Sequence, residues 1–174
     1  MNSHNVFFQK ANNKKNALMS SFDIIINSTN PSDEELKKRT FNYLEWIEKK
    51  NNLFCNEKNP VHKNFSKIKR GSVAWIDFGF NIGNEFGGRH PAIILRKTPS
   101  SVFVLPLSSQ PPNNFETIVE IDKVYGFKNM KRWTNVLRLQ SVSEKRIDYS
   151  SSIGNIKGPV LDQINEMLKE SYVF

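Results

Sequence analysis

The segment covering residues 79–91 holds the residue types best suited to chemistry. Glu85, Arg89 and His90 bring a carboxylate, a guanidinium and an imidazole into one glycine-rich stretch between two apolar runs. An imidazole exchanges protons near neutral pH, and a guanidinium supplies fixed positive charge. The same pattern fits a long hairpin loop in which Gly87-Gly88 adopts positive φ angles. Both interpretations stay open on these residues alone.

The spacing of glycines, cysteines and histidines argues against cofactors and metals. The glycines of residues 79–91 follow neither the dinucleotide-binding pattern nor the Gly-Lys-Ser/Thr ending of a phosphate loop. Cys55 is the only cysteine, and the three histidines, His4, His62 and His90, are scattered along the chain. No zinc-ligand spacing results. We therefore expect no cofactor and no bound metal.

Further polar groups are candidates for binding nucleic acid or for assisting His90. The formal net charge is +8 and the isoelectric point is about 9.6, which suits either a polyanionic partner or simple solubility. Ser108 ends an apolar run with a hydroxyl, although it also fits a polar turn. A basic patch with one aromatic residue is a candidate RNA-binding surface, because bases stack on aromatic rings. It consists of Lys128, Lys131, Arg132 and Trp133.

The segments that must position these groups predict a mainly β domain with helices, of the α+β class. Five short runs rich in Val, Ile, Leu and aromatic residues lie between turn residues, which predicts a small antiparallel barrel or sandwich. The runs are Ser72–Phe78, Pro91–Leu95, Ser101–Leu107, Glu116–Ile121 and Asn135–Gln140. Gly158-Pro159 then opens an amphipathic segment that predicts a C-terminal helix.

The first 66 residues differ in composition and are expected to form an N-terminal extension before a domain at 67–174. Residues 1–31 are rich in Asn, Ser and Lys, so we expect part of this arm to be loose. Ser32 and Glu35 have capping-box spacing and predict an amphipathic helix over about 32–50. The sequence shows no apolar run long enough for a membrane span or a secretory signal, and a cytoplasmic location is expected.

Several segments together resemble the MazF/PemK toxin family of type II toxin-antitoxin systems. Lys69-Arg70-Gly71-Ser72-Val73 and Gly83–Leu95 resemble the family's first two strands and their loop, and Val104–Ser108 resembles its next strand. Tyr125-Gly126-Phe127, and Leu139–Val142 before Lys145-Arg146-Ile147, resemble a later strand and turn of the domain, and a C-terminal helix follows. The resemblance covers about residues 67–170, whereas the N-terminal extension has no counterpart in compact family members.

The resemblance implies a fold, an activity and partners. It implies an SH3-like small barrel that forms a homodimer, cleaves single-stranded RNA without metal and is inhibited by an acidic antitoxin protein. The family usually has Arg at the position of His90 and a hydroxyl at the position of Ser108. Here Arg89 comes one residue earlier. Glu85 is a candidate to orient Arg89 or His90, although a Glu in a loop also fits a solvated charge or a partner of a structural Arg.

Two hypotheses follow. In the first, the chain is an endoribonuclease that leaves 2′,3′-cyclic phosphate ends, with His90 as acid or base, Arg89 beside the phosphate, and Ser108 and Glu85 assisting. Adjacent residues in a strand point to opposite faces, so Arg89 and His90 need not converge. In the second, the chain is a catalytically impaired relative that binds RNA or a protein. Convergence of these side chains on one groove separates the two hypotheses.

Overall fold

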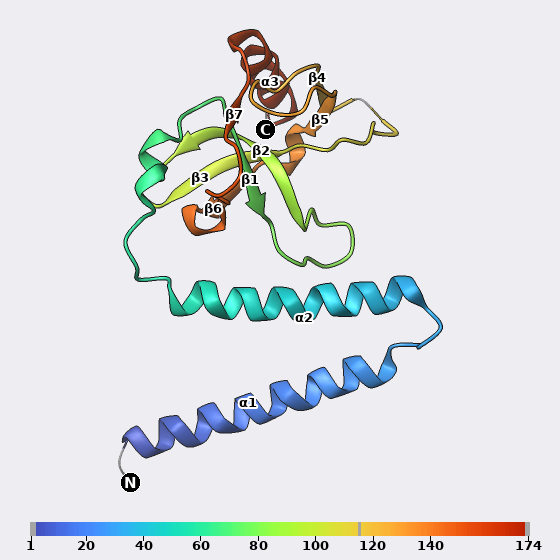
Figure 1. Ribbon diagram of the computed structural model, residues 1–174, viewed down its shortest axis with the longest axis vertical. Helices are drawn as coiled ribbons and strands as arrows, with labels where there is room; N and C mark the ends of the chain where they lie inside the picture. The colour runs from blue at the N-terminus through green and yellow to red at the C-terminus, as the bar shows by residue number, and fades with distance from the viewer. Residues whose placement is uncertain (1–2, 115, 173–174) are drawn as a thin grey trace. The chain divides into compact units, whose positions relative to one another are not determined.

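The computed structural model of the protein describes residues 3–114 and 116–172 (Figure 1). The chain forms two compact units, Met1–Asn52 and Leu53–Phe174. The first unit is helical and the second contains the sheets. All the candidate site residues lie in the second unit, so the two units are described separately below.

The N-terminal unit is a helical hairpin made of α1 (Ser3–Ser28) and α2 (Glu34–Cys55), the last turn of which runs into the second unit. The side chain of Asp33 accepts a hydrogen bond from Leu36 N at 2.9 Å, so Asp33, not the expected Ser32, caps α2. The helix also runs five residues beyond the predicted end at Lys50. The arm expected to be loose is helical from Ser3 to Ser28.

The two helices meet through a polar pair and an aromatic pair. The Thr29 and Thr40 hydroxyls lie 3.0 Å apart, and the rings of Phe22 and Tyr43 meet edge to face with centroids 6.4 Å apart. No side chain within residues 6–52 is buried. Hydrophobic burial therefore contributes little to holding this hairpin together.

The second unit is built on a five-stranded antiparallel sheet (Figure 1). Its strands are β1 (Ser72–Asp77), β2 (Arg89–Lys97), β3 (Ser101–Pro106), β6 (Gln140–Ser143) and β7 (Gly154–Asn155), in the order β6-β3-β2-β1-β7. A separate ladder pairs β4 (Ile118–Ile121) with β5 (Arg132–Asn135). Isolated β-bridges, such as the one between Ser108 and Trp133, connect the five-stranded sheet with this ladder. The expected α+β fold with antiparallel strands is confirmed, but the sheet is not closed into a barrel.

Each face of the sheet packs its own apolar cluster, because successive side chains of a strand point to opposite sides. One cluster includes Ile76 of β1 and Phe65 of the 3₁₀ turn η1 (Lys63–Lys67). The other includes Ile93 of β2 and Ile164 of α3 (Gly158–Ser171), a helix with Pro159 in its first turn as expected. Burial on both faces explains the continuous apolar runs Val73–Ile76 in β1 and Pro91–Leu95 in β2.

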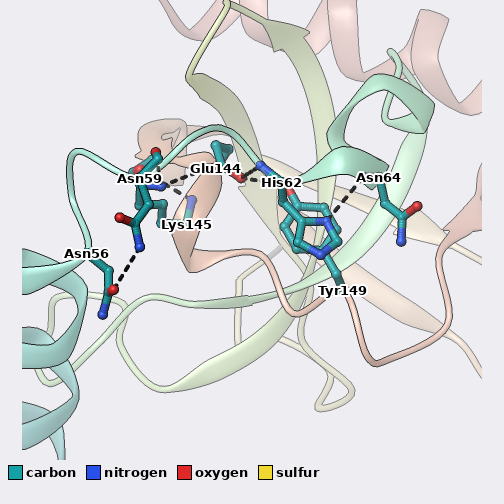
Figure 2. Close-up of polar contacts among 8 residues, drawn as sticks. Asn56, Asn59, His62, Asn64, Glu144, Lys145 and Tyr149 are labelled. Atoms are coloured by element: carbon teal, nitrogen blue, oxygen red, sulfur yellow. Dashed lines mark hydrogen bonds and ion pairs between the residues drawn. The ribbon is translucent and has the colours of Figure 1, made fainter.

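The segment that follows α2 is bound to the sheet unit through Glu144, which begins the 3₁₀ turn η3 (Glu144–Arg146) (Figure 2). The buried Glu144 carboxylate accepts hydrogen bonds from Tyr149 Oη at 2.9 Å and His62 N at 3.4 Å. Lys145 Nζ lies 3.4 Å from Glu144 Oε1 and donates to Asn59 O at 2.9 Å. The His62 ring stacks on Tyr149 at 4.0 Å. Residues 59–65 therefore belong structurally to the sheet unit.

Candidate functional site

The β1–β2 loop has a closed neck that fixes the position of Phe86. Phe78 N donates to Gly88 O at 2.8 Å, and Gly88 N donates to Gly79 O at 2.7 Å. Gly79 and Gly88 have positive φ angles of 85° and 80°, whereas Gly87, expected to share this conformation, does not. A Cβ on Gly87 would instead lie 2.8 Å from Gly79 O, so a close backbone approach requires this glycine.

The Phe86 ring is held between the loop and the core. It meets Phe78 edge to face with centroids 5.3 Å apart, while Asn81 Nδ2 donates to Phe86 O at 2.6 Å. The ring also lies 4.6 Å from the His90 ring and 4.9 Å from the guanidinium carbon of Arg138. Phe86 therefore contacts both an imidazole and a guanidinium.

His90 lies near the start of β2, opposite Ile76 of β1, and is partly buried. Burial is the main effect that lowers its pKa below the ordinary 6.5, and the positive charge of Arg138 lowers it further. A hydrogen bond to the backbone of Leu107 acts in the opposite direction. The net effect leaves the imidazole neutral at neutral pH, which is the form that accepts a proton.

Arg89 contacts a different set of residues. Its guanidinium donates to Asp148 Oδ2 at 2.5 Å and to Ser151 Oγ at 2.7 Å, and it lies 4.5 Å from the centre of the Trp75 ring. Hydrogen bonds from Ser150, and next from Arg89, hold the pKa of Asp148 well below its usual range. Strand alternation thus directs Arg89 and His90 to different partners.

Ser108 lies just beyond β3 at the edge of a pocket of about 420 Å³. Ala92 of β2 pairs with Pro106 of β3, so continuing the register places His90 and Ser108 at the same end of this strand pair. Phe86, Trp133 and Arg138 also line the pocket. The Ser108 hydroxyl accepts from Gln110 N at 3.0 Å and donates to Gln110 O at 3.1 Å, as in the polar turn considered from the sequence.

The remaining predicted site residues form hydrogen bonds or ion pairs within the protein, or lie apart from one another. The Glu85 carboxylate accepts from Ile82 N at 3.2 Å and closes a turn of the loop. Lys131 pairs with Glu120, and its Nζ lies 3.6 Å from Asp122. Trp133 Nε1 donates to the same Glu120 at 3.1 Å.

The two other basic residues of the predicted RNA-binding patch differ in exposure. Arg132 is 5% exposed, lies against the Phe127 ring and is hydrogen-bonded to the carbonyls of residues 128 and 130. Lys128 is exposed. The patch therefore presents fewer available charges than its composition indicates, although Trp133 does reach the pocket.

Arg138 is the site residue that sequence reasoning missed. It ends the 3₁₀ turn η2 (Val136–Arg138), where a continuous strand over Asn135–Gln140 was predicted. Asn135 caps this turn by accepting a hydrogen bond from Leu137 N at 2.9 Å. The available signal was a single charged residue within an otherwise apolar run, Val136-Leu137-Arg138-Leu139.

Within residues 3–114 and 116–172, no three His, Cys, Asp or Glu side chains are grouped so that they could hold a metal ion. Over the same residues, no helix combines the length and hydropathy needed to cross a membrane.

Residues 69–172 match the sequence family described as PemK-like, MazF-like toxin of type II toxin-antitoxin system. No curated protein sequence gives a significant match. Among solved structures, Mycobacterium tuberculosis toxin MazF-mt6 is similar, with 15% identity, a TM-score of 0.45, and coverage of 57% of this chain and 94% of that chain. MazF from Deinococcus radiodurans has 18% identity, a TM-score of 0.48, and coverage of 60% and 94%. The MazE-MazF structure from that organism has 18% identity, a TM-score of 0.46 and the same coverage.

Proposed function

Because the chain belongs to the family of PemK-like, MazF-like toxins of type II toxin-antitoxin systems, we propose that it is an endoribonuclease that cleaves single-stranded RNA without a metal ion. The observation that carries the proposal is the grouping of a partly buried imidazole with a pocket that offers a hydroxyl, two aromatic rings and a guanidinium. Aromatic rings suit unpaired bases, and the guanidinium suits a phosphate.

In the proposed mechanism, His90 is the general base. The neutral imidazole takes the proton of the ribose 2′-hydroxyl, and the 2′-oxygen attacks the adjacent phosphorus. The 5′-oxygen leaves and takes a proton from solvent, so the products are a 2′,3′-cyclic phosphate and a 5′-hydroxyl. Ser108 hydrogen-bonds a non-bridging phosphate oxygen once the substrate displaces its contact with Gln110. Arg89 and Glu85 hold the start of β2 and its loop in place.

Membership of the family also supports a proposal for regulation and location. An antitoxin protein with an acidic segment binds this basic chain, whose net charge is +8, and blocks the pocket. The enzyme and its antitoxin act in the cytoplasm, where the RNA substrate is found.

The test is to incubate the purified full chain with single-stranded RNA oligonucleotides of varied sequence in excess chelator. We expect cleavage, with product ends that become phosphatase-sensitive only after acid opens the cyclic phosphate. His90→Ala is expected to lower the rate by about 10²-fold or more, the usual scale for a general base. The matched control is His62→Ala, which removes an imidazole that stacks on Tyr149. Cleavage that disappears with chelator would contradict the metal-free mechanism.

One observation favours a second candidate function, an RNA- or protein-binding module without catalysis. Two of the predicted catalytic groups are engaged within the protein, Arg89 by Asp148 and Ser108 by Gln110. If the full chain binds single-stranded RNA but neither it nor His90→Ala cleaves any of the oligonucleotides, the binding module replaces the enzyme.

A further inference from the structure

We propose that Asn135 selects the base that the pocket accepts. It favours a base with an exocyclic keto oxygen, uracil or guanine, over a base with an exocyclic amino group, cytosine or adenine. The inference rests on the proposed ribonuclease function and names the substrate class of the same pocket. It depends on the direction in which the Asn135 amide is held.

The amide oxygen of Asn135 is used within the protein. Oδ1 accepts hydrogen bonds from Leu137 N at 2.9 Å and from Thr117 Oγ1 at 3.1 Å. A backbone N–H is a donor only, so turning the amide over would place its NH₂ group against another donor. The two hydrogen bonds therefore fix which end of the amide is left for other partners.

The amide nitrogen is available to a ligand. Asn135 lines the pocket of about 420 Å³ and is partly exposed, and within residues 3–114 and 116–172 its Nδ2 has no hydrogen-bond partner. Asn114, which also lines the pocket, is oriented in the same way, because its Oδ1 accepts from Glu116 N at 2.9 Å. Both amides offer N–H donors, so a ligand that supplies acceptors complements them.

Strand geometry brings Asn135 next to an aromatic ring on which a base can stack. Trp133 and Asn135 are two residues apart in β5, so their side chains point to the same face of the strand at a spacing of about 7 Å. Thr134 between them is buried. A hydrogen bond to Glu120 at 3.1 Å orients the Trp133 indole. A base stacked on Trp133 therefore has one edge within reach of Asn135 Nδ2.

The pairing of donors with acceptors then decides which base is favoured. The keto oxygen O4 of uracil or O6 of guanine accepts a hydrogen bond from Nδ2, whereas the amino group of cytosine or adenine places N–H against N–H. In the mismatched case both groups lose their hydrogen bonds to water without replacement. The usual pairing of adenine with an Asn side chain also needs the amide oxygen, which is occupied in Asn135.

The other groups of the pocket distinguish less between bases. The rings of Phe86 and Trp133 stack on any base, and the guanidinium of Arg138 suits the phosphate that every nucleotide carries. The Ser108 hydroxyl both donates to and accepts from Gln110. A base preference is therefore expected to depend on Asn135.

The test is to cleave a pool of single-stranded RNA of random sequence with the purified full chain and to sequence the new ends. We expect uracil or guanine to exceed cytosine or adenine by about 10-fold or more at one position beside the cut, the scale set by one unpaired donor. Asn135→Asp keeps the acceptor for Leu137 N and replaces the NH₂ group by an oxygen of the same size. This variant is expected to reverse the preference at that position to cytosine or adenine.

The measured quantity is the ratio between bases, because the added carboxylate repels phosphate and slows cleavage of every sequence. Asn135→Ser, whose hydroxyl can still cap the turn, is expected to abolish the preference without reversing it. The matched control is Asn155→Asp, the same change at an exposed residue of β7 outside the pocket lining, and it is expected to keep the wild-type preference. Thermal melting verifies that each variant is folded.

Two results would overturn the inference: a wild-type chain that cuts with no keto preference, or an Asn135→Asp variant that keeps the wild-type preference. A wild-type chain that cleaves no RNA would instead refute the proposed function. The same random pool, selected by binding to the immobilised full chain, then tests the inference by itself. Bound RNA in which keto bases are enriched for the wild type but not for Asn135→Asp would support it, and any other composition would overturn it.

Discussion

His90 and Arg89 are consecutive residues with different surroundings. His90 contacts Phe86, and the charge of Arg138 acts on its pKa. Arg89 instead contacts Asp148 and Trp75. The titratable group lies against Phe86, which lines the pocket, and the permanently charged group holds a neighbouring segment. Chemistry that depends on pH is therefore expected at this site, because an imidazole changes charge in the accessible range and a guanidinium does not.

The first prediction concerns the pH dependence of cleavage. The proposed base must be neutral, and burial lowers the pKa of His90 below 6.5. The rate is therefore expected to be level near neutral pH and to fall as the pH drops through the lowered pKa. The measurement is the rate of RNA cleavage against pH for the wild type. His90→Arg is the informative companion, because increased activity in that variant would show that His90 is a degenerate site.

The second prediction concerns acid stability. Hydrogen bonds from Ser150, and then from Arg89, lower the folded-state pKa of Asp148 below its ordinary 3.8. A carboxyl group with a lowered pKa stabilises the fold above the unfolded-state pKa, and that contribution is lost as the pH falls toward the folded-state value. Arg89→Gln raises the folded-state pKa of Asp148 toward 3.8, so this variant is expected to unfold at a higher pH during acid titration.

Circular dichroism during that acid titration provides the measurement. Arg96→Gln is the control, since it removes an exposed cation from the same strand. Identical acid midpoints for the wild type and Arg89→Gln would show that the ion pair with Asp148 contributes nothing to stability.

Among the elements, the β1–β2 loop has a hydrogen-bonded neck next to Phe86, which lines the pocket. Because a Cβ on Gly87 would lie 2.8 Å from Gly79 O, a backbone atom, Gly87→Ala must widen the neck and move Phe86. We expect this variant to lose about 1–3 kcal/mol of unfolding free energy, the range typical of overpacking. We also expect reduced cleavage. Thermal melting and RNA cleavage assays measure the two effects.

The matched control in the same loop is Gly83→Asn. Gly83 has a φ of 60° with nothing within 4 Å of an added Cβ, and Asn tolerates this left-handed conformation. We expect its stability and activity to stay close to those of the wild type. Equal behaviour of Gly87→Ala and Gly83→Asn would show that the neck does not control the pocket.

The sequence predicted the elements where burial decides the structure. Four predicted strands match β1 to β4 in order and place, because their apolar residues are buried in the two clusters. The strand predicted over Asn135–Gln140 is wrong because the Asn135 side chain caps a 3₁₀ turn. The helical conformation of the first arm was also missed, since its apolar residues form no strong one-sided pattern.

The candidate site was harder to predict than the fold. Of the segments singled out from the sequence, Ser108 lines the pocket, and residues 79–91 contribute Phe86 to it. Their role in catalysis stays a prediction. Arg138 could not be found in the same way. It reaches the pocket through a turn that interrupts an apolar run, and only tertiary structure shows that it shares the Phe86 ring with His90.

The helical unit and the sheet unit are expected to differ in their ability to fold alone. The sheet unit has two apolar clusters, whereas residues 6–52 have no buried side chain. We predict that residues 53–174 fold alone, and that residues 1–52 alone show little stable helix. Circular dichroism of the two fragments is the measurement, and cooperative melting of the 1–52 fragment would contradict this prediction.

The position of the cut is important for that experiment. Removing residues 1–65 would delete Phe65, which is 3% exposed in the core, as well as His62 and Asn59, which bind the Glu144 region (Figure 2). A fragment that starts at residue 66 is therefore expected to be less stable than one that starts at residue 53. This difference separates loss of the helical hairpin from damage to the sheet unit.

The final prediction is that the chain is a homodimer formed through its sheet unit. A pocket of about 420 Å³ accommodates little more than one nucleotide with its phosphate, so a single-stranded RNA needs further surface on either side. Two copies related by a two-fold axis provide a longer groove with a site at each end. Light scattering at micromolar concentration is expected to give about twice the 20.1 kDa of one chain.

The 53–174 fragment should also be a dimer, because the family domain lies within it. A monomeric fragment beside a dimeric full chain would assign the interface to the helical hairpin, whose apolar side chains are exposed. A monomeric full chain would contradict the shared groove altogether.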